Sequence, residues 1–390
     1  MTKTACLAPI PLCVLALALH PGGVFSQEGA ADADARDATD EPGVSLTIGG
    51  VGIGIGDVPR LNGLRLNFRD REMRLVNGIN ATIWTPHEPA LGTVRGLALG
   101  VPVTGARRIE GVGLGAGVGA DGAFVGLGLA PIGIGAGGVL RGVFAAGLGV
   151  GAGDAVSGVA VGGLGVGTGG ALQGVAIGGL GVGTGGSLDG GAIGGLGVGA
   201  GGPVRGILAG GLGVGAGGPV TGLAVAGLGV GAAESLDGVV IAGLGVGAGG
   251  SIRGLTIAGL GAGAGGDMTG VNIAGIGLGV GGEAKWVNLA GVGVGASRVT
   301  GVTLTGVGVA AERITGLTVA PLYLRVTPGG EMRGVSVSAF NRIEGAQRGL
   351  AIGILNIAEE LDGLQIGLIN IARNKPSRRV LPFFNYYREP

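Results

Sequence analysis

Cysteine, histidine, aromatic side chains and charge are all scarce in this chain of 390 residues. The two cysteines, Cys6 and Cys13, lie near its start, so the remainder can hold neither a disulfide nor a thiolate-bound metal. The two histidines, His20 and His87, have no catalytic motif around them. Only 13% of residues are charged and the net charge is zero, which excludes a broad basic surface for nucleic acid. The sequence predicts a non-enzymatic protein without catalytic residues, cofactor, metal or nucleic-acid partner.

Residues 1–26 have the composition of an export signal. Lys3 precedes an apolar stretch from Ala5 to Leu19, and Val24-Phe25-Ser26 forms a small-residue cleavage site. The alternative is an N-terminal membrane anchor, although this stretch is shorter than the ~20 residues that a spanning helix needs. Residues 27–43 are rich in Ala and Asp without apolar periodicity, which predicts a disordered acidic spacer.

What the chain has in abundance is glycine, 98 residues, within a repeat of sixteen residues. Collagen is excluded because glycine does not recur at every third position. Repeats of fixed period are stabilised by stacking on their neighbours. Large aliphatic residues mark the period at Ile132, Leu148, Leu164, Leu180, Leu196, Leu212, Leu228, Leu244, Leu260, Ile276 and Val292.

One unit, from Met268 to Val280, indicates how each repeat folds. Its apolar residues are spaced by steps of three, two, three, two and two, whereas a single straight strand with one apolar face would keep steps of two. We interpret the steps of three as corners, one of them at Ala274-Gly275, which predicts an all-β fold, a β-solenoid of about 16-residue coils. Glycine pairs such as Gly265-Gly266 predict the tight turns. In this interpretation Leu212 points inward and Gly213 points outward.

Three regions follow the spacer. Residues 44–95 are more polar and predict irregular N-terminal coils or a cap, residues 96–374 form the repeat array, and residues 375–390 form an aromatic C-terminal cap. The alternative fold is an outer-membrane β-barrel, of porin type, with one strand per unit. Low charge and a mean hydropathy of +0.60 favour it, whereas the broken alternation of apolar residues does not.

The segments Val76-Asn77-Gly78-Ile79, Gly363 to Asn370 and Leu381 to Asn385 resemble a bacterial surface-repeat family first described in leptospires. Units of that family read Gly-Leu-Gln-hydrophobic-Gly-Leu-hydrophobic-Asn, and the likeness is most specific over about the last 60 residues. In the middle of the chain only the repeat spacing is similar. The resemblance implies an exported protein of unknown activity and supplies no catalytic residues.

Three motifs that could signal a ligand have simpler explanations. Gly165 to Gly170 satisfies the G-x-G-x-x-G pattern of dinucleotide sites, but near-copies recur in most units, which predicts turn glycines. Calcium-binding repeats place Asp regularly in their turns. Here the aspartates fall at irregular offsets from the marker residues, which disfavours calcium binding; they are Asp154, Asp189, Asp237 and Asp267. The pairs Arg107-Arg108 and Arg378-Arg379 are expected to be solvated.

The feature with the most functional weight is a predicted flat face of small residues between Gly111 and Gly250, as in Ala160, Gly162, Gly165 and Gly167. We expect an exported structural protein at the cell surface, periplasm or outer membrane. The flat face would serve self-association or contact with the cell envelope, including its membrane. A polysaccharide-processing enzyme is the remaining class, and it would need clustered carboxylates on one face, which the repeat does not provide.

Overall fold

The computed structural model describes residues 43–86 and 88–388, and every regular element in these ranges is a β-strand. The predicted export signal at 1–26 and all of the predicted spacer except Gly43 lie outside the described residues. Among the described residues, no helix is long and apolar enough to cross a membrane. The chain divides into two compact units, residues 1–185 and residues 186–390.

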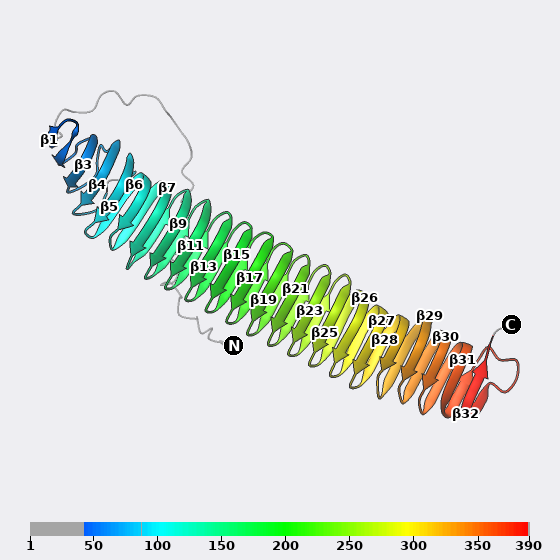
Figure 1. Cartoon of the computed structure of the whole chain (residues 1–390). Helices are drawn as coiled ribbons and strands as arrows, with labels where there is room; N and C mark the ends of the chain where they lie inside the picture. The colour runs from blue at the N-terminus through cyan, green and yellow to red at the C-terminus, as the bar shows by residue number, and fades with distance from the viewer. Residues whose placement is uncertain (1–42, 87, 389–390) are drawn as a thin grey trace, which may run out of the picture. The chain divides into compact units, whose positions relative to one another are not determined.

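The first unit contains β1 to β14 (Figure 1). It begins with an antiparallel hairpin of β1 and β2, and β2 then pairs in parallel with β3. Its strands are β1 Val44–Ile48, β2 Val51–Ile55, β3 Arg60–Asn67, β4 Leu75–Thr82, β5 Thr93–Gly100, β6 Val103–Leu114, β7 Gly117–Ala130, β8 Gly133–Ala136, β9 Val139–Ala146, β10 Gly149–Ala152, β11 Ala155–Gly162, β12 Gly165–Thr168, β13 Leu172–Gly178 and β14 Gly181–Thr184.

The second unit contains β15 to β32. From β26 on, the short and long strands of one coil join into a single bent strand. Its strands are β15 Leu188–Gly194, β16 Gly197–Ala200, β17 Val204–Gly210, β18 Gly213–Ala216, β19 Val220–Ala226, β20 Gly229–Ala232, β21 Leu236–Ala242, β22 Gly245–Ala248, β23 Ile252–Ala258, β24 Gly261–Ala264, β25 Met268–Ala274, β26 Gly277–Ala290, β27 Gly293–Thr305, β28 Gly308–Val319, β29 Tyr323–Val337, β30 Phe340–Ile352, β31 Leu355–Ala372 and β32 Val380–Tyr387.

Each coil of the array consists of a short strand and a longer strand, and equivalent strands of successive coils pair in parallel. β16 pairs with β18 so that Gly197 faces Gly213, and β17 pairs with β19 so that Val204 faces Val220, both sixteen residues apart. The described residues thus form about 19 turns of a β-solenoid, as the sequence predicted. Parallel stacking rules out the alternative fold, in which each unit supplied one strand of an antiparallel barrel.

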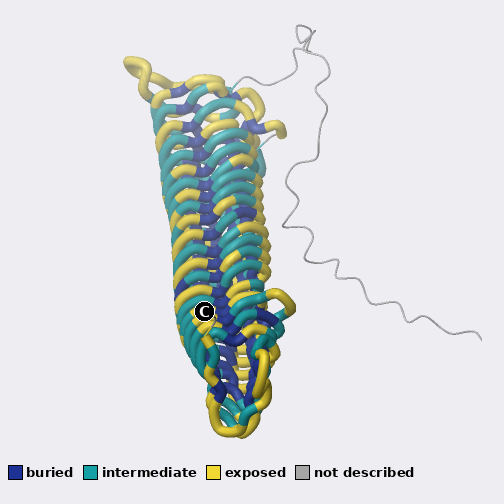
Figure 2. Tube along the Cα trace, turned by 90° about the vertical axis from the view of Figure 1, so that its right-hand side faces the viewer, coloured by how far each residue is buried: buried dark blue, intermediate teal, exposed yellow. Residues whose placement is uncertain are grey.

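The core of each coil lies between the two walls made by the short and the long strands (Figure 2). In the coil that contains β16 and β17, Val198 and Ala200 point inward from the short strand, and Val204, Leu208 and Gly210 are buried from the long one. The turn between the walls falls at Gly201-Gly202, where glycine pairs predicted it.

The marker residues of the repeat point outward, which contradicts the prediction for Leu212. This side chain is 49% exposed, whereas Val214 is buried. Gly211 and Leu212 form a two-residue corner between strands, and the Leu212 N–H donates to the Leu196 carbonyl at 2.7 Å. The backbone ladder therefore fixes this position and leaves its side chain on the outside. Gly213 does lie on the outer side, as predicted, with intermediate exposure.

The same correction applies to the unit from Met268 to Val280. Met268, Leu278 and Val280 are buried as expected, but Val271 and Ile276 are exposed. Strict alternation runs through β25, so the step of three from Met268 to Val271 leads from the inner to the outer face and not around a corner. Large aliphatic residues consequently occupy both sides of the long strands.

A column of glycines with positive φ crosses every long strand of the array. Gly206, for example, has φ +131°, and a Cβ there would overlap the carbonyl oxygen of Gly190 in the coil below. Such a conformation strongly favours glycine. The column is interrupted once among the described residues, at Trp286, which adopts φ 84° and is 61% exposed.

The C-terminal strand β32 runs antiparallel to the last part of β31. Its aromatic rings point away from the core, since Phe383 and Phe384 are 71% and 64% exposed. Asn385 is the buried residue of this strand, and its Nδ2 donates to the Asn370 carbonyl at 3.4 Å. The end of the core is therefore covered by a paired strand and an amide side chain.

Candidate interaction face

The outer side of the long strands carries two rows of aliphatic side chains. They occupy the two outward positions that follow each positive-φ glycine, such as Ile207 and Ala209 after Gly206. Parallel pairing without slippage places each of these residues beside its equivalent in the next coil. The first row of the second unit comprises Ile207, Leu223, Val239, Leu255, Val271, Val287, Val302, Leu317, Val335, Leu350 and Leu364, and the second comprises Ile193, Ala209, Val225, Ile241, Ile257, Ile273, Leu289, Leu304, Val319, Val337, Ile352 and Ile366.

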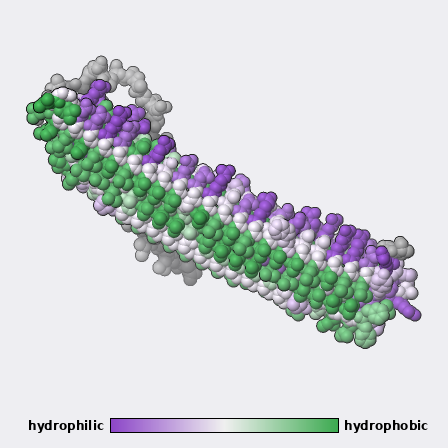
Figure 3. Space-filling model, viewed as in Figure 1, coloured by the Kyte–Doolittle hydropathy of each residue, from purple (hydrophilic) through white to green (hydrophobic). Residues whose placement is uncertain are grey.

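A third row lies at the corner after each long strand. Its residues are about half exposed while their backbones form a continuous ladder, as in Leu228 N–H to Leu212 O at 2.8 Å. In the second unit this row comprises Leu196, Leu212, Leu228, Leu244, Leu260, Ile276, Val292, Val307 and Leu322. The three rows together are called the aliphatic face. Figure 3 shows it as a continuous hydrophobic band over the long strands of each unit.

The first unit repeats this arrangement. Its first row passes through Leu127, Val143, Val159 and Val175, whose side chains are 36% to 47% exposed. The rows also continue onto the N-terminal hairpin, because Ile53 of β2 pairs with Leu64 of β3, and Leu46 of β1 pairs with Ile53.

The size of the aliphatic face exceeds that of an ordinary exposed patch. With about 4.8 Å between strands, the first row from Ile207 to Leu364 is about 50 Å long, and the three rows span roughly 15 Å along the strands. The resulting ~750 Å² is more than the roughly 300–600 Å² of the largest patch on a typical monomer. Large exposed apolar patches of this kind usually mark an interaction surface.

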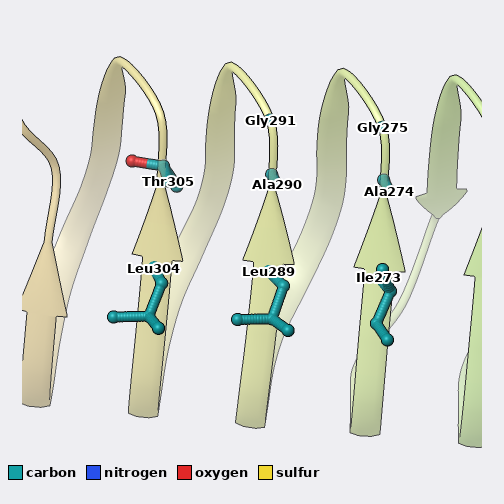
Figure 4. Close-up of a pocket in the computed structure, with 8 residues that line it drawn as sticks. All are labelled: Ile273, Ala274, Gly275, Leu289, Ala290, Gly291, Leu304 and Thr305. Atoms are coloured by element: carbon teal, nitrogen blue, oxygen red, sulfur yellow. The ribbon is translucent and has the colours of Figure 1, made fainter.

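A shallow hollow of about 380 Å³ lies between the second row and the corner row. In Figure 4 the side chains of Ile273, Leu289 and Leu304 stand at the same height on three neighbouring strands. The hollow is also lined by Ala274, Gly275, Ala290, Gly291 and Thr305. It contains no ionisable group, so it can offer an apolar contact but no acid, base or metal ligand.

A polar row borders the aliphatic face on the other side of the glycine column (Figure 3). Some of its charges are paired between coils, as in Arg253 Nη1 to Asp237 Oδ1 at 3.3 Å. Near the C-terminus Glu331 accepts a hydrogen bond from Arg333 Nε at 2.7 Å and forms an ion pair with Arg348 Nη1, also at 2.7 Å. The hydrogen bond from Arg333 is the main reason that the pKa of Glu331 lies below its usual range. The row presents both signs of charge.

Buried polar side chains form ladders inside the coils. Asn341 Nδ2 donates to Asn356 Oδ1 at 2.8 Å, and Asn356 Nδ2 donates to Asn370 Oδ1 at 2.7 Å. Gln365 Nε2 donates to Gln347 Oε1 at 2.8 Å. The Gln and Asn of the resembled surface-repeat motif therefore lie in the core, where they link successive coils.

A buried ion pair lies inside the N-terminal coils. Arg65 and Asp70 are almost completely buried and bonded to each other, and Arg65 also donates to Asn80 Oδ1 at 3.1 Å. Thr82 Oγ1 donates to Asp70 Oδ2 at 2.8 Å. Removing one partner of such a buried pair typically costs about 3–5 kcal/mol. This cluster links the neighbouring coils.

The residues that the sequence singled out do not converge on one site. His87 lies outside the described residues. The segment Gly165 to Gly170 forms strand β12 and a turn. Arg107 and Arg108 line an open hollow of about 510 Å³ together with Asp154. Among residues 43–86 and 88–388, no three His, Cys, Asp or Glu side chains gather closely enough to hold a metal ion.

The predicted flat face of small residues is only partly correct. Ala160 and Gly162 point into the core, because the long strand β11 buries every second residue after Val159. Gly165 and Gly167 do lie outward on the short strand β12, and a Cβ at Gly167 would meet no atom within 4 Å. The small residues thus cover the short-strand wall alone. The aliphatic face on the other wall was missed because apolar residues were assumed to be inside.

Comparisons of this chain with protein-family models, with curated proteins and with solved structures give no match.

Proposed function

We propose that this chain is an exported, non-enzymatic structural repeat protein of the cell envelope, and that it associates with further copies of itself through the aliphatic face. The observation that carries the proposal is the three rows of outward-pointing aliphatic side chains, half-buried or exposed, in register along the coils. Export and envelope location rest on residues 1–26 and on the resemblance to the surface-repeat family.

A second copy fits the face better than other partners do. The ~750 Å² of the second unit matches the roughly 800 Å² that each partner of a standard protein interface buries. Regular rows at about 4.8 Å spacing can interdigitate with identical rows, as the inner faces of two packed sheets do. The rows contain no Trp or Tyr and are bordered by both signs of charge, whereas surfaces that bind anionic membranes are rich in aromatic and basic residues.

The proposal is tested by adding one charge to either wall. Ile207→Lys places an ammonium on the aliphatic face at a side chain that is 55% exposed, so the fold should tolerate it. Gly215→Lys is the matched control on the short-strand wall, where a Cβ would meet no atom within 4 Å. Sedimentation of the full-length chain should show at least tenfold weaker association for Ile207→Lys and unchanged association for Gly215→Lys.

Three results would count against the proposal. Loss of association in Gly215→Lys alone would mean that the copies associate through the glycine-covered short-strand wall. A monomeric wild-type chain at high concentration would exclude self-association. Flotation of that monomer with uncharged phosphatidylcholine vesicles, lost in Ile207→Lys, would assign the face to lipid. Location is tested separately, by sequencing the N-terminus of the chain recovered from the envelope, where cleavage after Ser26 is expected.

A further inference from the structure

Within residues 43–86 and 88–388, β1 is an edge strand that pairs on one side only, with β2. Its sequence Val44-Ser45-Leu46-Thr47-Ile48 contains neither charge nor proline, and all five residues are exposed. Ile48 is 92% and Leu46 74% exposed. Natural edge strands are usually blunted by Lys, Pro, bulges or a covering segment, because an open edge is a template for another strand.

The hairpin geometry shows which backbone groups are unpaired. A two-residue turn at Gly49-Gly50 joins β1 to β2, and Ile48 faces Val51. Along a strand of an antiparallel pair, the backbone N–H and C=O groups of successive residues point alternately toward the partner strand and away from it. In the residue pair that closes a two-residue turn, these groups are hydrogen-bonded to each other. Leu46 and Ile48 therefore bond β2, while Ser45 and Thr47 direct N–H and C=O groups toward the open edge.

The C-terminal edge strand β32 is also uncharged, but its backbone is blunted in ways that the backbone of β1 is not. In β32, Pro382 has no N–H, and Phe383 has a positive φ of 68°. Its pairing with β31 is interrupted between Gly367 and Asn370. Lys375 lies beside this strand, with Nζ 2.8 Å from Asn385 Oδ1. These features are the ones that prevent strand addition, so β32 is not a suitable partner for β1.

We propose that β1 pairs antiparallel with β1 of a second copy, about a twofold axis that passes beside Leu46. In this register Ser45 and Thr47 of each copy bond Thr47 and Ser45 of the other, and all five residues are paired. The strand carries no charge that would repel its own copy. A twofold axis makes such a contact self-complementary and closed. Val44, Leu46 and Ile48 of both copies then lie on one side, as an extension of the aliphatic face.

This contact uses a backbone edge and does not depend on lateral association through the aliphatic face. It predicts a specific cross-link. Leu46 faces Leu46 of the second copy in a non-bonded pair, whose Cα atoms are about 4.5 Å apart, within the roughly 4.4–6.8 Å range of disulfides. The two Val44 residues are four positions apart along the strands, about 13 Å, which is too far.

The test uses the full-length chain with Cys6→Ala and Cys13→Ala, into which Leu46→Cys or Val44→Cys is introduced. Mild oxidation should convert Leu46→Cys into a covalent dimer at least tenfold faster than Val44→Cys. Thr47→Pro, added to Leu46→Cys, removes an N–H at the open edge and should slow cross-linking by a similar factor. Circular dichroism checks that each variant keeps its β-structure.

Adding Ile207→Lys to Leu46→Cys separates the two proposals. Cross-linking should persist in this variant even though lateral association is lost. Equal cross-linking of Leu46→Cys and Val44→Cys would overturn the twofold pairing of β1, as would cross-linking that disappears with Ile207→Lys. Absence of any dimer, together with flotation on phosphatidylcholine vesicles that Thr47→Pro leaves unchanged, would instead make the hairpin a lipid-binding element.

Discussion

The column of positive-φ glycines predicts that two glycine-to-alanine changes in neighbouring coils have opposite effects. At Gly206 the backbone has φ +131°, and an added Cβ would overlap the Gly190 carbonyl oxygen. At Gly215, on the short strand β18, an added Cβ would meet no atom within 4 Å. Both changes add the same methyl group to the same solenoid.

The magnitudes follow from the local backbone. Holding a non-glycine residue at positive φ costs about 1–3 kcal/mol. Forcing the methyl group against a backbone oxygen that cannot rotate away adds about 1–3 kcal/mol, as overpacking usually does. Alanine also restricts the unfolded chain, which stabilises the fold by about 0.4–1 kcal/mol in both variants. The net expectation is destabilisation by roughly 2–5 kcal/mol for Gly206→Ala and slight stabilisation for Gly215→Ala.

Hydrogen exchange of the backbone amides is the appropriate assay, because long repeat arrays do not unfold as one cooperative unit. Gly206→Ala should accelerate exchange in β15, β17 and β19, the strands on either side of the changed position. Gly215→Ala should leave exchange in β16, β18 and β20 unchanged or slower. Similar protection of β17 in the two variants would refute the role assigned to the glycine column.

Three further predictions concern single side chains. Leu208→Asp should destabilise its coil and the neighbouring coils by several kcal/mol because it buries a charge, whereas Leu212→Asp should change their stability by less than about 0.5 kcal/mol, and hydrogen exchange of the surrounding amides would compare them. Trp286→Gly should stabilise the surrounding coils by about 1 kcal/mol through relief of the positive φ, measured in the same way; a loss of stability would mean that the exposed ring makes a compensating contact. The pKa of Glu331 is lowered in the folded state, so its contribution to stability is present above the usual glutamate pKa and is lost as the pH falls through the folded value. Glu331→Gln should therefore make stability depend less on pH on the acid side. An unchanged pH dependence would contradict the stabilising role of Glu331.

The sequence predicted the coil but not which side of each strand faces inward. The sixteen-residue period and the glycine turns follow from local backbone requirements, and these can be recognised from residue types. The orientation of Leu212 depends instead on whether the corner has two residues or three, which shifts every later side chain to the opposite face. No residue type in Gly211-Leu212-Gly213 distinguishes these possibilities.

The aliphatic face was hidden by a second ambiguity, the identity of the residues that fill the core. Inward positions of the long strands hold Ala160, Ala192 and Ala224, and even Asn272 and Asn288, whose amides bond each other between coils. The equivalent positions of neighbouring coils hold Phe144 and Leu208, so residue size does not mark the inward face. Hydrophobicity alone would have placed the alanines and asparagines outside. A sequence with both small and large apolar residues on every strand does not show which set is buried.

The open edge follows from the way the coils are held together. Many inward positions hold Ala or Gly, whose burial contributes little, so the backbone ladders between coils contribute a large share of the stability. A ladder has no natural end, and its last strand remains competent to pair unless the sequence prevents it. At β32 the sequence does so with proline and a positive φ, while β1 retains an uncharged edge beside the same aliphatic rows. This asymmetry predicts association at the N-terminal end and not at the C-terminal one.

Deleting Val380 to Pro390 should therefore create a second open edge at β31 and turn dimers paired through β1 into longer chains, which sedimentation would detect. An unchanged species would show that β32 does not protect that end.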